Sequence, residues 1–239
     1  MTLGPSRTQV KKAGKLLRNY WLSDDGLEDL SEEEQSGLSD AYGLVVDYRS
    51  GFASPLLKVR VGLQSFIKTT GYPEAQIGQR LKRFQRIMEK LARYQNMQLT
   101  TMQDIGGCRV VMPDLDGVAK IRSHIEKVWG DSLVEVYDYI SKPQESGYRA
   151  VHVVVRRDDR LIEVQLRTVR QHRWADAVEQ YSRQLGIEMK WGLGGHRVQD
   201  GFARMADYLS VLDEGGIADV DNVLEELLGW ADMIDEPED

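Results

Sequence analysis

Apolar positions in the first hundred residues recur at the spacing of helices, as at positions 84, 87, 88 and 91. Ser31 is followed by Glu34 three residues later, which is the spacing of a capping box at a helix start. The segment 69–75, "TTGYPEA", interrupts the pattern, because Gly and Pro are poor in either regular element. Helices are therefore expected at 7–21, at 32–48, after Pro55 and at 84–94.

After residue 100 the apolar residues alternate as they do in strands. Predicted strands and predicted helices then follow one another along the chain. This order predicts an α+β core with a mixed or antiparallel sheet. The sequence "RRDDR" at 156–160 predicts a hairpin connection between the last two strands. Strands are expected at 107–112, 132–140, 148–155 and 160–168. Helices are expected at 116–129, 169–185 and 198–212, with a glycine-bearing loop, "KWGLGGH", before the last and an amphipathic pattern at 220–228.

The chain has 239 residues, of which 41% are hydrophobic, enough to fill a core. Its one cysteine cannot form an intrachain disulfide. The first residues lack the apolar centre of a signal peptide, and no run of about 18 apolar residues occurs. We therefore expect a cytoplasmic protein without a membrane span.

Acidic residues are concentrated at the C-terminus, so the net charge of −7 does not describe the whole chain. The segment 213–239 holds eleven Asp or Glu and no Lys or Arg, and the rest of the chain has a net charge of +4. Phosphate-bearing ligands therefore suit the body of the protein. Two clusters carry much of the positive charge: Arg7, Lys11, Lys12, Lys15 and Arg18, and Arg80, Lys82, Arg83, Arg86, Lys90 and Arg93. The first cluster alone is equally consistent with an ordinary solvated helix face.

Two carboxylates stand at the predicted sheet. In the strand 160–168, Glu163, Gln165 and Arg167 fall on one face, which an ordinary amphipathic strand with a solvated face also explains. Asp104 lies just before another strand and is followed by a Gly-Gly pair that permits close approach to the backbone. Carboxylates from two strands would form a site for Mg²⁺, which prefers oxygen ligands.

Basic residues precede this sheet at spacings that suit a triphosphate. Arg80 and Lys82 are two positions apart, as on one face of an extended segment, and Lys90 lies on the following predicted helix. Such groups neutralise charge during phosphoryl transfer. No glycine-rich P-loop motif occurs, and four scattered histidines with one cysteine do not have zinc-ligand spacing.

Four ordered segments, "RLKRFQRIMEKL", "DIGGCRVV", "YDYISKPQESGYRAVHVVV" and "EVQLRT" followed by "HRWADAVE", resemble the synthetase domain of the RelA/SpoT family. The resemblance covers about residues 55–195. It implies a nucleotidyltransferase-like core with a mixed sheet, and transfer of the β,γ-diphosphate of ATP to a ribose 3'-hydroxyl. The expected domains are a helical region at 1–54, a pyrophosphokinase domain at 55–195 and a helical region with an acidic tail at 196–239.

The resemblance also implies a role for individual residues. Asp104 and Glu163 match the catalytic carboxylates that bind magnesium, and Glu163 would help deprotonate the attacking hydroxyl. Arg80 and Arg109 would sandwich the adenine of ATP, while Lys82 and Lys90 would hold its phosphates. Tyr148 would stack on the acceptor base within the loop "SKPQESGYRAVH", and Lys142, His152 and Gln165 would line the acceptor side. Arg86 departs from the family, where many members have serine, and would either strengthen phosphate contact or obstruct it.

Stand-alone members of the family either make alarmones from GDP or GTP, or act as toxins that make adenosine alarmones or modify the 3'-CCA end of tRNA. Residues 1–54 contain no histidine and are too short for a hydrolase domain, so a stand-alone synthetase is expected. The basic residues Lys11, Lys12 and Lys15 favour tRNA, since an acceptor stem requires a positive surface beyond the active site. A guanine or adenine nucleotide acceptor, and a degenerate synthetase that acts as an interaction module, stay open as alternatives. An antitoxin partner and a homo-oligomer are compatible with the resemblance.

Overall fold

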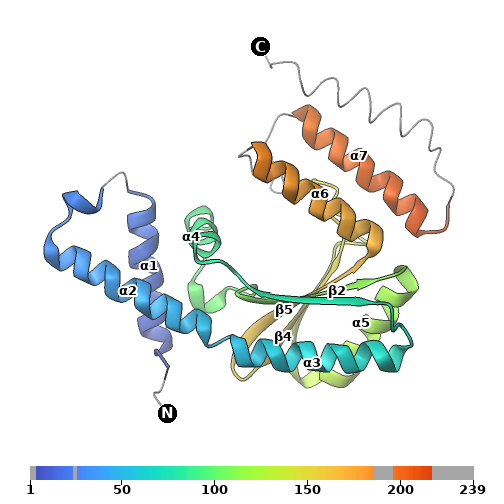
Figure 1. Cartoon of the computed structure of the whole chain (residues 1–239), viewed down its shortest axis with the longest axis horizontal. Coiled ribbons are helices and arrows are strands. Elements are labelled where there is room, and N and C mark those ends of the chain that lie inside the picture. The colour runs from blue at the N-terminus through green and yellow to red at the C-terminus, as the bar shows by residue number, and fades with distance from the viewer. Residues whose placement is uncertain (1–3, 24–25, 186–195, 217–239) are drawn as a thin grey trace.

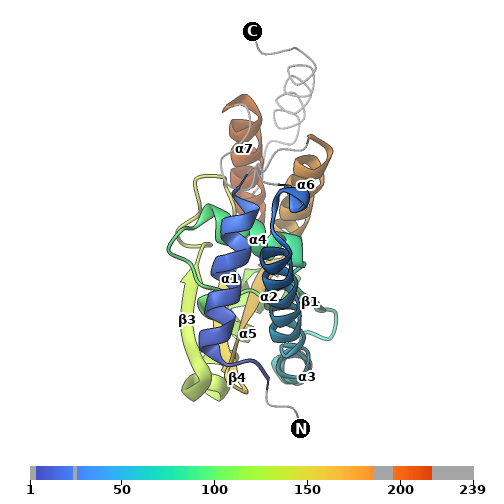
Figure 2. The same cartoon turned by 90° about the vertical axis from the view of Figure 1, so that its left-hand side faces the viewer.

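A computed structural model describes residues 4–23, 26–185 and 196–216, and it contains a five-stranded mixed sheet (Figure 1). The strand order is β1-β2-β5-β4-β3, and only β2 and β5 run parallel. The outer strands β1 and β3 lie at opposite edges (Figure 2). The predicted α+β fold with a mixed sheet is therefore confirmed. The strands are β1 Gln76–Leu81, β2 Gly106–Met112, β3 Leu133–Asp138, β4 Val151–Arg157 and β5 Arg160–Thr168.

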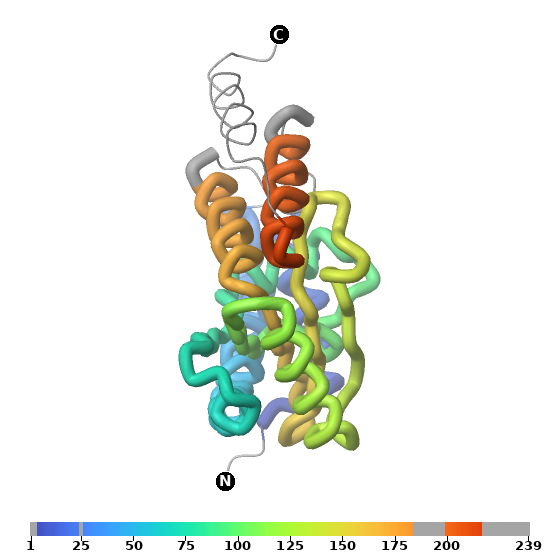
Figure 3. The backbone as a smooth tube through the Cα atoms, turned by 90° about the vertical axis from the view of Figure 1, so that its right-hand side faces the viewer, coloured from blue at the N-terminus to red at the C-terminus, as the bar shows by residue number. Residues whose placement is uncertain are grey.

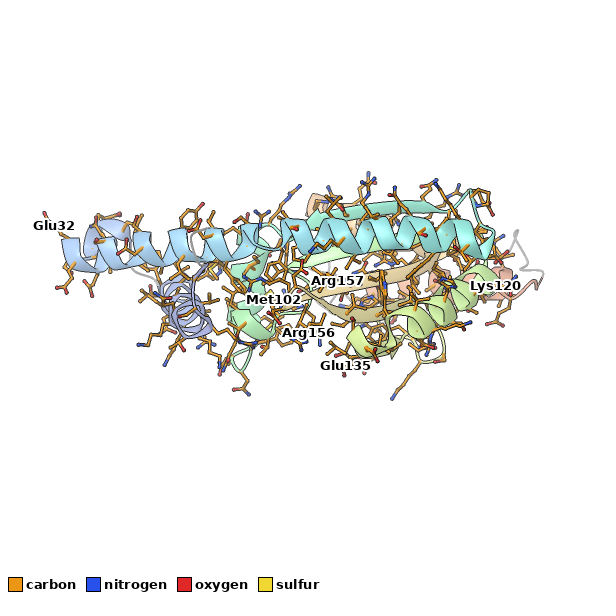
Figure 4. The ribbon with its side chains drawn as sticks, turned by 90° about the horizontal axis from the view of Figure 1, so that it is seen from below. Glu32, Met102, Lys120, Glu135, Arg156 and Arg157 are labelled. Carbon is orange, nitrogen blue, oxygen red and sulfur yellow. The ribbon has the colours of Figure 1, made fainter. Side chains whose placement is uncertain are left out.

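Helices cover both faces of the sheet and extend beyond one end of it. Helices α3 and α5 lie on one side, α6 and α7 lie on the other, and α1 and α2 project from the end near α4 (Figure 1). Glu32, at the start of α2, and Lys120, in α5, lie at opposite ends of the molecule (Figure 4). The helices are α1 Arg7–Trp21, α2 Glu32–Ser50, α3 Ala53–Thr70, α4 Phe84–Arg93, α5 Leu115–Trp129, α6 Val169–Leu185 and α7 His196–Asp213, with short 3₁₀ turns at Leu27–Asp29, Leu99–Thr101 and Gly130–Ser132.

Local signals in the sequence account for several element ends. Ser31 and Glu34 form the predicted capping box at the start of α2, and Ser6 with Gln9 forms another at the start of α1. The β4–β5 hairpin turns through Asp158 and Asp159, whose φ angles are 47° and 60°. Such positive angles are those of a tight two-residue hairpin turn. The predicted hairpin is therefore confirmed.

The strand predicted at 148–155 starts later than expected, and the strand at 132–140 ends earlier. β3 ends at Asp138, whose carboxylate accepts hydrogen bonds from the backbone N–H groups of Ile140 and Ser141 and so turns the chain away. β4 begins only at Val151, because Gly147 has a φ of 82° and the Tyr148 side chain is buried against the helices. The last helix begins at His196, two residues before its predicted start. The loop predicted before it and the amphipathic pattern at 220–228 lie largely or wholly outside the described residues.

The sheet face toward α3 and α5 is apolar. Val110 of β2, Val153 of β4 and Val164 of β5 are fully buried there, as strand alternation requires for the face opposite Glu163. This face forms the main hydrophobic core. It leaves the other face of the sheet for polar side chains. In the described residues no helix is long and apolar enough to cross a membrane.

Cys108 lies on this buried face and should be chemically inert. Burial raises the pKa of its thiol to about 12, so the nucleophilic thiolate is scarcely populated near neutral pH. We expect a thiol-specific reagent to label the native protein much more slowly than protein unfolded in denaturant. The measurement is the rate of labelling by mass spectrometry. Equal rates in the two states would show that the β2 region opens readily.

Candidate active site

The polar face of the sheet gathers residues from three strands in one row. In the strand register, Gly107 of β2 pairs with Arg80 of β1 on one side and with Glu163 of β5 on the other. A side chain at Gly107 would meet nothing closer than the Glu163 backbone oxygen, at 3.8 Å. The glycine therefore leaves open space between the arginine and the carboxylate. The next row along the sheet holds Arg109 beside Gln165.

Asp104 lies just before β2 and is held by two lysines. The Lys82 ammonium is 2.8 Å from Oδ2, and the Lys90 ammonium is 2.9 Å from Oδ1. Lys82 is brought here by its backbone N–H, which donates to the Ile105 carbonyl at 2.8 Å, and Lys90 comes from α4. Burial would raise the pKa of Asp104, but the two ammonium groups outweigh it and lower that pKa. Asp104 is therefore an ionised carboxylate with two cations beside it.

Glu163 is a partly buried carboxylate with a hydrogen bond at each oxygen. His152 Nδ1 lies 3.1 Å from Oε1, and the Gln165 amide donates to Oε2 at 2.7 Å. Burial would raise the pKa of Glu163, but the His152 and Gln165 contacts lower it overall. The charge of Asp104 acts in the opposite direction and raises the pKa of Glu163, so the two carboxylates interact electrostatically.

The two carboxylates are the donors available to a metal ion here. Within residues 4–23, 26–185 and 196–216 no group of three or more His, Cys, Asp or Glu is placed to hold one. Mg²⁺ is commonly bound by only one or two carboxylates, with substrate phosphates and water as its other ligands. Because Asp104 and Glu163 are both ionised and repel each other, the donor set fits a hard cation.

The arginines expected around adenine are on the same face but differ in exposure. Arg80 is exposed on β1, whereas Arg109 lies partly beneath α6, 3.4 Å from both His172 Nδ1 and Asp176 Oδ1. Burial, followed by the charge of Arg167, lowers the pKa of Arg109. A flat aromatic group between Arg80 and Arg109 would separate two like charges.

Two other predicted residues, Arg86 and Lys142, have exposed side chains. Arg86 forms an ion pair with Glu89 of the same helix at 2.8 Å, and its side chain is 49% exposed. The contribution of Arg86 to ATP binding stays a prediction. Lys142 is exposed in the segment that follows β3.

Tyr148, the residue expected to stack on the acceptor base, is only 4% exposed. Helix α7 packs beside the 139–150 segment, which is yellow in Figure 3. A Cβ at Gly147 would lie 2.8 Å from the Ala206 side chain. Arg149 and Asp207 form an ion pair at 2.8 Å across the same contact. An acceptor base can therefore reach the Tyr148 ring only if this contact opens.

Arg167 is a site residue to which sequence reasoning assigned no role. Strand alternation had already placed it on the face of Glu163 and Gln165, which is the signal that could have identified it. In the structure it donates to both Tyr148 and Gln165. The His172 and Asp176 contacts from α6 to Arg109 were also not predicted, because they join elements distant in sequence.

The basic residues of α1 form a solvent-exposed surface. Lys11, Lys12 and Lys15 are exposed, while Val10 and Leu17 are buried on the other side of the helix. Helix α1 packs against α4, which carries Lys90 (Figure 2). The lysines are thus on a helix next to the one that carries Lys90.

Residues 79–184 match the model of a family described as "Region found in RelA / SpoT proteins". An uncharacterized protein of Mycobacterium tuberculosis is 34% identical over 107 residues, covering 44% of this chain and 39% of that protein. The GTP pyrophosphokinase YjbM of Bacillus subtilis is 32% identical over 86 residues, covering 33% of this chain and 41% of that protein. The chain thus spans about two fifths of the length of these curated relatives.

Solved structures share the fold. The small alarmone synthetase 1 of Bacillus subtilis, in a crystal structure with its product pppGpp, has a TM-score of 0.60 and 24% identity. That match covers 70% of this chain and 93% of the synthetase chain. The match shows that this chain has the fold of small alarmone synthetases.

Proposed function

We propose, from the RelA/SpoT region at residues 79–184, that this protein is a pyrophosphokinase that transfers the β,γ-diphosphate of ATP to a ribose 3'-hydroxyl. One observation carries the proposal: an ionised Asp104 held by Lys82 and Lys90, close enough to Glu163 for their charges to interact. Phosphoryl transfer is catalysed mainly by positioning and charge stabilisation, which this arrangement supplies.

The basic residues would bind and orient the donor. Lys82 and Lys90 would leave Asp104 for the phosphates, and Arg80 with Arg109 would enclose the adenine. Asp104 and Glu163 would hold Mg²⁺, which neutralises phosphate charge when bound. Together these groups would fix the β-phosphorus in line with the acceptor.

Glu163 would accept the proton of the acceptor hydroxyl. Its pKa is lowered, so the carboxylate is in the unprotonated form that a general base requires. The 3'-oxygen then forms a bond to the β-phosphorus, the bond between that phosphorus and the α,β-bridging oxygen breaks, and AMP leaves. His152 and Gln165 keep the Glu163 side chain in place throughout.

For the acceptor, we propose the 3'-CCA end of tRNA, which would make the protein a growth-inhibiting toxin with an antitoxin partner. The exposed Lys11, Lys12 and Lys15 support it, because tRNA carries phosphates beyond the active site and a free nucleotide does not. A guanine nucleotide acceptor is the second candidate, and the name GTP pyrophosphokinase carried by a 32% identical relative favours it.

Label transfer distinguishes the acceptors. The protein is incubated with Mg²⁺ and ATP labelled at the γ-phosphate, with deacylated tRNA, GDP, GTP, AMP or ADP offered separately. Label on tRNA alone is the expected result. Label on a guanine or adenine nucleotide alone would identify an alarmone synthetase and overturn the tRNA proposal. No transfer to any acceptor would contradict the pyrophosphokinase proposal and favour a degenerate synthetase that acts as an interaction module.

Neutralising two α1 lysines should weaken tRNA binding in a salt-dependent way. For the double variant Lys11→Gln with Lys15→Gln, we expect the slope of log Kd against log salt to fall in magnitude by about 2, one per lost phosphate contact. The measurement is tRNA affinity at several KCl concentrations. The matched control is Lys68→Gln with Lys127→Gln, two exposed lysines on α3 and α5. Equal slopes of log Kd against log salt in the two double variants would show that the α1 lysines are an ordinary solvated surface and not a tRNA-binding one.

A further inference from the structure

Arg167 of β5 is a buried cation at the base of the polar face. Its side chain is 1% exposed. Its Nη2 donates to the Tyr148 hydroxyl oxygen at 2.6 Å and to Gln165 Oε1 at 2.8 Å. The guanidinium carbon lies 5.0 Å from the centre of the Tyr148 ring. One guanidinium therefore contacts two side chains that lead toward Glu163.

The first path to Glu163 runs through Gln165. An arginine can only donate hydrogen bonds, so the Gln165 atom that faces it has to be the carbonyl oxygen. The amide nitrogen of Gln165 is then directed at Glu163 Oε2, to which it donates at 2.7 Å. Arg167, which only donates, and Glu163, which only accepts when ionised, thus together fix the orientation of the Gln165 amide.

The second path runs through Tyr148 and His152. The Tyr148 oxygen accepts from Arg167, and its hydroxyl can donate its hydrogen to His152 Nε2, which lies 2.6 Å away. A neutral His152 that accepts at Nε2 carries its hydrogen on Nδ1, which then donates to Glu163 Oε1 at 3.1 Å. Both oxygens of Glu163 therefore face donors on side chains that are held at their other end by Arg167, directly for Gln165 and through Tyr148 for His152.

The burial of Arg167 is not explained by core stability. Its Nε and Nη1 have no hydrogen-bond partner among the residues that the structure describes. Burying such donors unpaired costs free energy, and no carboxylate ion pair with Arg167 occurs in the same part of the chain to offset it. The cost of burying Arg167 in this position points to a role in the site.

We propose that Arg167 is a positioning residue that orients Gln165 and the Tyr148–His152 pair, and through them holds both oxygens of Glu163. The inference rests on the proposed function, in which Glu163 accepts the proton of the acceptor hydroxyl. Arg167 donates to Tyr148 and Gln165, whereas the hydrogen bonds to the two Glu163 oxygens come from His152 and Gln165, so its effect is exerted through these neighbours.

Arg167→Met tests the role against a purely structural one. We expect kcat to fall about 10- to 100-fold, the effect of losing an outer partner of a catalytic group, with the KM for ATP unchanged. The thermal midpoint should stay the same or rise, because an unpaired buried charge is replaced by an apolar chain of similar length. The matched control is Arg157→Met: Arg157 also has a buried, unpartnered Nε, but it lies over the Trp129 ring. A retained kcat in Arg167→Met would overturn the proposal.

A second measurement reads the orientation without any assay of activity. In ¹⁵N NMR spectra of the wild type, the Gln165 side-chain amide should exchange slowly and neutral His152 should carry its hydrogen on Nδ1. Spectra of Gln165→Leu and His152→Gln assign the signals. Both features should be lost in Arg167→Met, and unchanged signals would overturn the proposal.

If Arg167→Met does not fold, Arg167→Lys keeps the charge without the planar fork and should lose at least one of the two features. A wild type without transferase activity that still shows both features would contradict the proposed function alone.

Discussion

Glu163→Gln is expected to lower the rate of diphosphate transfer roughly 10²- to 10⁴-fold, the usual contribution of a positioned general base. The substitution keeps the size of the side chain but removes the charge and the ability to take a proton. It also disturbs the local hydrogen bonds, because an amide offers only one oxygen to the donors on His152 and Gln165. The measurement is the initial rate of transfer of the labelled diphosphate at saturating ATP.

Glu74→Gln provides the matched control for this variant. Glu74 is exposed in the turn before β1, so the same chemical change there should leave the rate unaltered. Thermal unfolding of both variants verifies that the fold is retained. A wild-type rate in Glu163→Gln would remove Glu163 from the mechanism, whatever acceptor the enzyme uses.

Tyr148→Ala is expected to lower the free energy of unfolding by about 3–5 kcal/mol, the range for removing a large buried aromatic side chain. Tyr148 packs among Trp174 of α6 and Phe202 and Ala206 of α7, and its hydroxyl belongs to the buried network. The loss should be measured by urea-induced unfolding, with Tyr148→Phe as a variant that retains the ring.

The control for this stability effect is a tyrosine outside that cluster. Tyr94 is 38% exposed, so Tyr94→Ala should cost much less, on the order of 1 kcal/mol or below. Equal losses would contradict the burial of Tyr148 beneath α7. The same comparison is needed before the activity of Tyr148→Ala is interpreted. If the loop has unfolded in this variant, weak use of the acceptor cannot be assigned to the loss of stacking.

Much of the fold followed from periodicity and local chemistry. The helix spacing at residues 84–94 and the capping box at Ser31 predicted helices that the structure contains. Alternation in the last strand put Glu163 on the polar face, and the register of the sheet agrees. The end of β3 was harder to place, because Asp138 stops the strand by hydrogen bonds from its own side chain.

The sequence by itself determined which residues of a strand or helix share a face, because a period of two in strands and 3.6 in helices assigns each side chain to a face. The tertiary structure alone decided what lies against that face. Helix α7 reaches Tyr148 from more than fifty residues away, and Lys82 and Lys90 converge on one carboxylate from different elements. Arg167 likewise acquires its two acceptors only when β5 and the 139–150 segment are brought together. Periodicity describes one element at a time, whereas such contacts depend on how separate elements pack.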